Sequence, residues 1–92
     1  RKKSILIISA NHQAIAADIL NRIGRGATYL EAKGAYSGKS MEILMVVLNE
    51  RDYFKLQSIV NNHDPNAFII VQNAQRVVGG AFRYHSHIGE EE

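Results

Sequence analysis

The sequence predicts a small α+β domain in which the elements follow the order β-α-β-β-α-β, a ferredoxin-like series. Four short segments rich in β-branched or alternating residues predict strands. Two segments with apolar residues three and four positions apart predict helices after the first and third of these strands. With 92 residues, of which 46% are hydrophobic and 22% are charged, the chain has the length and composition of one folded domain.

The first half of the chain supplies a strand, a helix and a second strand. Residues 4–9 form a run that is apolar on both faces of the predicted strand. Asn11 is placed to cap a helix, and Gly24 is placed to end it. Residues 27–33 then alternate, which predicts a half-exposed strand at an edge of the sheet. The apolar stripe of the helix consists of Ile15, Ala16, Ile19, Leu20 and Ile23.

The second half repeats the pattern after a glycine-containing loop at residues 34–39. Residues 43–48 predict a strand that is again apolar on both faces, and Asn49 is placed to cap a second helix. Asp64-Pro65 ends this helix, because the residue before proline avoids the helical region. The stripe of this helix is Tyr53, Leu56, Ile59 and Val60, residues 67–71 predict the fourth strand, and residues 76–78 are a candidate for a short fifth strand. We divide the chain into a domain over residues 1–82 and a polar C-terminal tail over residues 83–92.

The order of elements predicts a sandwich with two helices on one face of a four-stranded antiparallel sheet. Right-handed crossovers place the first and third strands side by side in the middle of this sheet. We expect this central pair itself to run parallel.

The strands carry more apolar surface than two helices can cover. Whichever of the pairs Ile5/Ile7 and Leu6/Ile8 packs under the helices, the other pair points away, and residues 43–48 and 68–71 pose the same choice. About seven large side chains share the uncovered face. If they stay in water, the domain loses on the order of 15 kcal/mol of the free energy that their burial would contribute. We expect a homo-oligomer that buries this face; the alternatives are another domain or the chain's own segment around residues 77–82.

Composition excludes several classes of function. The net charge is +2 and the eleven basic residues are scattered, so the basic stripe of a nucleic-acid binder is missing. The absence of cysteine excludes disulfides and thiolate metal sites. No window of about 20 apolar residues could span a bilayer, and the chain begins at Arg1 without a signal peptide, as expected for a fragment of a longer protein.

The loop at residues 34–39 is the main candidate for a binding site. Its glycines are one residue too close for a Walker loop, and a strand rather than a helix follows Lys39-Ser40. One interpretation is that the loop binds a small anionic ligand or nucleotide. The alternative is that it is an ordinary connection between two strands. The candidate ligand-binding residues are Arg25, Thr28, Tyr36, Ser37, Gly38 and Lys39.

Catalytic and metal motifs are not evident. His85 and His87 would share one face of an extended tail, but no third ligand lies at motif spacing, so we expect no metal site. Small acylphosphatases share the supersecondary order, yet residues 9–12 lack the arginine and glycine cradle that such enzymes need. We expect no enzymatic activity and no cofactor.

Several separated motifs resemble the C-terminal domain of YitT-type bacterial membrane proteins, a domain of unknown function. The resemblance covers nearly the whole chain up to Phe82, and two of its motifs depart from the usual pattern. Ala35 and Ser37 stand in a loop that usually reads Gly-Gly-Tyr-Thr-Gly, and Val77-Val78 replaces an acidic residue. The matching stretches are Ile8-Ser9, Arg25-Gly26-Ala27-Thr28, Gly34-Ala35-Tyr36-Ser37-Gly38, Asp64-Pro65-Asn66-Ala67-Phe68 and Val78-Gly79-Gly80-Ala81-Phe82.

This resemblance implies a domain on the cytoplasmic side of the membrane, tethered to transmembrane helices that the present chain lacks. It also implies a fold similar to PII signal-transduction proteins, which assemble through their sheets and bind nucleotides between subunits. We therefore expect a regulatory or ligand-sensing module that acts through oligomerisation. A purely structural oligomerisation module and a small phosphate-handling enzyme are the alternatives.

Overall fold

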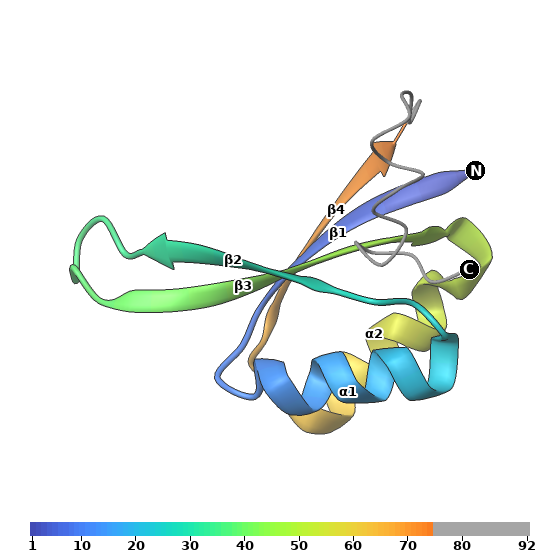
Figure 1. The fold of residues 1–92 in the computed structure, drawn as a ribbon, viewed down its shortest axis with the longest axis horizontal. Coiled ribbons are helices and arrows are strands. Elements are labelled where there is room, and N and C mark those ends of the chain that lie inside the picture. Colours follow the sequence, from blue (N-terminus) through green and yellow to red (C-terminus); the bar gives the residue numbers. More distant parts are fainter. Residues whose placement is uncertain (75–92) are drawn as a thin grey trace.

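The computed structural model describes residues 1–74, which form a four-stranded sheet with two α-helices beneath it (Figure 1). The strands are β1 (Lys2–Ile8), β2 (Thr28–Lys33), β3 (Ser40–Asn49) and β4 (Phe68–Ala74). The helices are α1 (His12–Ile23) and α2 (Tyr53–His63), and a short 3-10 helix, η1 (Glu50–Asp52), precedes α2. The predicted α+β class and the β-α-β-β-α-β order are confirmed; the candidate fifth strand and the tail lie outside the described residues.

The sheet has the order β2-β3-β1-β4, and all its neighbouring strands are antiparallel. The central pair was therefore predicted with the right neighbours but the wrong direction. The physical reason is the hairpin between β2 and β3. It reverses the chain, so β3 runs against β1 even though the α1 crossover leaves β1 and β2 pointing the same way.

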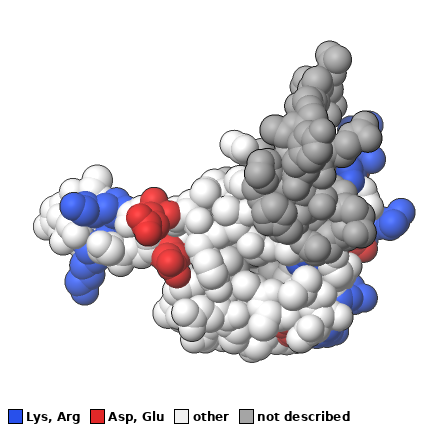
Figure 2. All heavy atoms as spheres, viewed as in Figure 1, with Lys and Arg blue, Asp and Glu red and all other residues white. Residues whose placement is uncertain are grey.

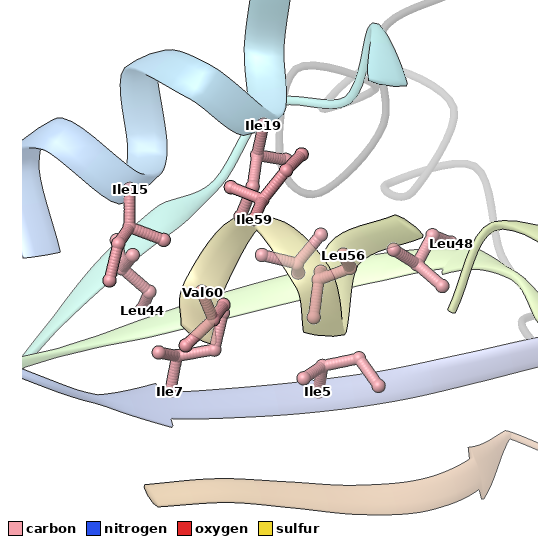
Figure 3. Close-up of a cluster of buried hydrophobic side chains, with 10 residues drawn as sticks. Ile5, Ile7, Ile15, Ile19, Leu44, Leu48, Leu56, Ile59 and Val60 are labelled. Atoms are coloured by element: carbon pink, nitrogen blue, oxygen red, sulfur yellow. The ribbon is translucent and has the colours of Figure 1, made fainter. Parts of the chain in front are cut away.

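Strand register decides which apolar side chains face the helices. Ile5 of β1 lies opposite Val46 of β3, and Ile7 lies opposite Leu44. All four are fully buried under the helices. The core is completed from α1, α2 and the end of β3, as Figure 3 shows, by Ile15, Ile19, Leu48, Leu56, Ile59 and Val60.

The helix ends agree only in part with the predicted caps. Gly24 ends α1 in the left-handed region at φ 79°, and its N–H reaches the carbonyls of Ile19 and Leu20. Asn11 occupies the N-cap position but makes no capping bond, and its side-chain NH2 group donates to the His63 carbonyl at 2.7 Å. Asn49 also makes no side-chain cap, since the chain passes through η1 before α2 begins.

A carboxylate joins the two loops at the end of β1. The Ser9 hydroxyl donates to Asp64 Oδ2 at 2.6 Å, and the Asn66 N–H donates to Asp64 Oδ1 at 2.9 Å. These two bonds, led by that of Ser9, hold the pKa of Asp64 below its ordinary value of 3.8, because they stabilise the charged form. The bridge ties the β1–α1 turn to the α2–β4 turn.

The orientation of α1 can be tested by comparing a buried and an exposed position on this helix. Ile19→Ala should lower the free energy of unfolding by about 2–5 kcal/mol, since it leaves a cavity among fully buried side chains. Leu20→Ala, at the next position of α1 where the side chain is 49% exposed, should change it by about 0.5 kcal/mol. Denaturant unfolding of both variants checks this. Equal losses would mean that α1 packs on a different side.

The hydrogen bond between Ser9 and Asp64 can be tested through the pKa of Asp64. Its pKa is lower in the folded state, so its contribution to stability is present above the unfolded pKa and is lost as pH falls through the folded pKa. Ser9→Ala removes the largest cause, so the pKa of Asp64 should rise toward its ordinary value. NMR titration of the carboxyl carbon measures the change. An unaltered Asp64 titration in this variant would show that the Ser9 hydroxyl does not set the pKa.

Candidate functional site

Two surfaces stand out once the fold is known, and the first is the face of the sheet away from the helices. We call it the outer face, and no helix of the described chain lies on it (Figure 1). Phe68 and Ile70 are 68% and 43% exposed there, and the other members are at least partly accessible. Register and alternation assign to the outer face Leu6, Ile8, Ile43, Met45, Val47, Phe68 and Ile70.

The outer face is apolar at its centre and polar at one end. Ile70, Leu6 and Met45 lie in one row across β4, β1 and β3. Two residues further along the strands, the row becomes Gln72, Ser4 and Val47, and after it come Lys2 and Asn49. An apolar centre with a polar margin is the composition of a protein contact surface rather than of a solvated sheet.

The second surface is the β2–β3 hairpin, which extends past the helices (Figure 1). Its tip, residues 34–39, is held by its own backbone: the Gly34 N–H donates to the Lys39 carbonyl, and the Gly38 N–H donates to the Gly34 carbonyl, both at 2.8 Å. The Ser37 hydroxyl accepts from the Lys39 N–H at 3.2 Å. Tyr36 is fully exposed, so the tip presents an aromatic ring to solvent.

The structure separates the predicted ligand-binding residues into two groups. Tyr36, Ser37, Gly38 and Lys39 lie together at the hairpin tip, past the end of β2. Arg25 and Thr28 lie at its other end, with Thr28 on the outer face opposite Met45. Six residues of strand span about 20 Å. A small ligand therefore does not touch both groups within one copy of the chain.

Polar side chains gather where the hairpin leaves the body of the domain. His12, the first residue of α1, places Nε2 2.9 Å from Glu42 Oε1 and Nδ1 3.3 Å from the Ser9 carbonyl. Its ring packs against Tyr29 in a T-shaped arrangement, with 5.5 Å between the ring centroids. Both ring nitrogens lie within hydrogen-bond distance of an acceptor oxygen, so the imidazole links the start of α1 to the hairpin.

A hollow of about 720 Å³ opens beside this cluster, and a second one of about 460 Å³ lies next to it, between Ser9, Glu42 and Asp64. Within residues 1–74, no grouping of three or more His, Asp or Glu side chains is suited to a metal ion. His85 and His87 lie outside that range. The first hollow is lined by His12, Glu31, Ala32, Lys33, Ser40, Met41 and Glu42.

The His12–Glu42 pair was not predicted from the sequence. A signal for it existed, because Glu42 has the same parity in β3 as the buried Leu44 and Val46 and must therefore face the helical layer. His12 could not be predicted as the partner of Glu42 in the same way, since its position depends on where α1 starts relative to the hairpin.

Comparison with known proteins gives the family. Residues 25–79 match the model of a family described as an uncharacterized protein conserved in bacteria, DUF2179. The UPF0750 membrane protein YxkD of Bacillus subtilis is 40% identical over 81 residues, which cover 88% of this chain and 29% of the relative. The UPF0750 membrane protein YitT of the same organism is 27% identical over 78 residues, which cover 85% of this chain and 28% of the relative. The chain thus spans less than a third of the length of these relatives.

Solved structures agree with this assignment. A crystal structure of a DUF2179 protein from Eubacterium ventriosum aligns with a TM-score of 0.71 and 32% identity, covering 78% of this chain and 99% of that one. A functionally unknown protein from Pediococcus pentosaceus aligns at a TM-score of 0.65 with 15% identity, covering 85% and 95%, which shows likeness of fold. None of the described helices has the length and hydropathy to cross a membrane. The chain belongs to the DUF2179 family, and its relatives include UPF0750 membrane proteins such as YitT, as the sequence motifs predicted.

Proposed function

We propose that this domain is a non-enzymatic regulatory module of a membrane protein and that it acts by joining copies of itself through the outer face. The observation that carries the proposal is the apolar row of Ile70, Leu6 and Met45 on a face that the two helices leave uncovered. The relatives are membrane proteins several times longer than the chain. In this proposal the rest of the protein lies in the membrane and the domain on its cytoplasmic side.

A second copy is the occupant that suits the size of the outer face. Phe68 and Ile70 are exposed and the other five members are partly accessible, so this face can form the apolar centre of an interface whose standard size is about 800 Å² on each partner. A twofold axis through the face lets the same residues serve both sides, with the polar end forming the rim. Burial of this face between two copies then adds hydrophobic free energy that a single copy, with the face in water, does not gain.

A ligand-responsive role of the hairpin tip is the second candidate. It is supported by the exposure of Tyr36 and by Lys33 and Lys39 beside it; blue side chains mark this free end of the hairpin in Figure 2. An anion bound there would order the tip and shift the association between copies. Contact of the same ligand with Arg25 or Thr28 would have to come from a neighbouring copy.

A matched pair of substitutions tests the outer face. Phe68→Lys places a charge on it, whereas Phe54→Lys places the same charge on α2, where the phenylalanine is 76% exposed. In sedimentation velocity, Phe68→Lys should shift the chain to monomer and Phe54→Lys should leave the assembly intact. Monomer in the unmodified protein would contradict the proposal and would favour the segment after residue 74 as the cover. Equal dissociation by both lysines would contradict the choice of face.

The tip is tested by ligand-induced stabilisation. Nucleotides and small anionic metabolites should raise the melting temperature of the unmodified protein, and Tyr36→Ala with Lys39→Ala should remove that rise. Association through the outer face should persist in the double variant. If no compound in such a panel changes the melting temperature, the tip has no sensing role and the structural module remains.

A further inference from the structure

The free edge of strand β2 is a surface separate from the outer face. In the described sheet β2 is the end strand, and the hairpin holds part of it clear of the helices (Figure 1). An end strand of this kind presents unpaired N–H and C=O groups to any strand that approaches it.

The hydrogen bonding of the hairpin shows which residues point their backbone outward. The Gly34 N–H donates across to the Lys39 carbonyl, in line with the register in which Lys33 faces Ser40. Bonded and non-bonded pairs alternate in an antiparallel ladder, so Ala32 and Leu30 bond inward to β3. Tyr29, Glu31 and Lys33 therefore direct their backbone groups to the free edge.

Two of these edge residues carry opposite charges, and both side chains are exposed. Among the described residues neither Glu31 nor Lys33 makes an ion pair or a side-chain hydrogen bond. Glu31 instead lies directly across the hairpin from Glu42, an arrangement in which like charges repel. Figure 2 shows acidic side chains next to the basic free end of the hairpin. A cation beside Glu31 would offset this repulsion.

We propose that two copies pair their β2 strands antiparallel about a twofold axis at Ala32. This register sets Glu31 of each copy opposite Lys33 of the other, and both are edge residues that can exchange backbone hydrogen bonds. Sliding by two residues in either direction sets Glu31 against Glu31 or Lys33 against Lys33, and like charges disfavour both. Charge thus selects one register among those that the backbone allows.

The residue on the axis fits this arrangement as well. Ala32 meets its own copy in a non-bonded pair, where the Cα atoms approach to about 4.5 Å and small side chains are favoured. Its methyl group lies on the outer-face side, as does Leu30, so pairing extends the apolar surface across both copies. The contact is small, which predicts weak, concentration-dependent association in solution.

Cysteine cross-linking tests the register, because the chain contains no cysteine of its own. Ala32→Cys should form a disulfide-linked dimer under mild oxidation, since this pair falls within disulfide range. Ala17→Cys, exposed on α1, is the control for random collision. Equal cross-linking at the two positions would overturn the proposal.

Charge variants then separate this contact from the outer face. In the Ala32→Cys background, Glu31→Lys or Lys33→Glu alone should each reduce cross-linking by about tenfold, because every opposed pair becomes repulsive. Mixing the two variants should restore it, since all opposed pairs are then of opposite sign. Phe68→Lys should leave this cross-link in place even where it abolishes outer-face assembly. Cross-linking that ignores the charges, or that is lost with Phe68→Lys, would contradict strand pairing.

Discussion

The constraint on which this domain depends is the mismatch between a sheet that is apolar on both faces and a helical layer that covers one. Ile5, Ile7 and Leu44 are sealed beneath α1 and α2, while Leu6, Met45 and Ile70 occupy equivalent positions on the other side. Alternation along a strand makes this unavoidable once the strands are apolar at every position. A strand that is apolar at every position in the middle of the sheet therefore leaves an apolar outer face as well as building the core, and our proposal assigns a second copy to that face.

Two polar side-chain pairs outside the apolar core connect segments of the described chain. Ser9 and Asp64 join the two turns at one end of β1, and His12 and Glu42 attach α1 to the projecting hairpin. Both pairs link segments far apart in sequence, and neither shows an arrangement that would bind a metal. The first pair joins two turns, and the second ties the start of α1 to the base of the hairpin.

Much of the architecture could be predicted because local signals agreed with one another. Gly24, Asp64-Pro65 and the helical stripe around Ile15 and Ile19 each marked an element that the structure contains. Strand lengths were underestimated, since β3 begins at Ser40 and β4 continues to Ala74, beyond the apolar runs. Those additional residues are held by pairing with β2 and β1, and pairing is not visible in local composition.

Local sequence patterns could not predict which face of the sheet is buried or which candidate site residues lie together. Ile5/Ile7 and Leu6/Ile8 are equally apolar, so only register against β3 and the helices decides which pair is buried. Arg25 and Tyr36 were grouped as candidates for contact with one anionic ligand, yet β2 holds them at opposite ends. The facing of Glu31 and Glu42 likewise follows from hairpin register, which the sequence alone left open.

The most direct measurement is an isotope-filtered NMR experiment on a mixture of labelled and unlabelled chains, which detects contacts between copies alone. If the outer face is the contact between copies, methyl groups of Leu6, Met45 and Ile70 will show intermolecular contacts. Those of Ile5 and Ile7, buried under the helices, will show contacts within one chain. Outer-face methyl groups that contact only their own chain, or only water, would contradict the account.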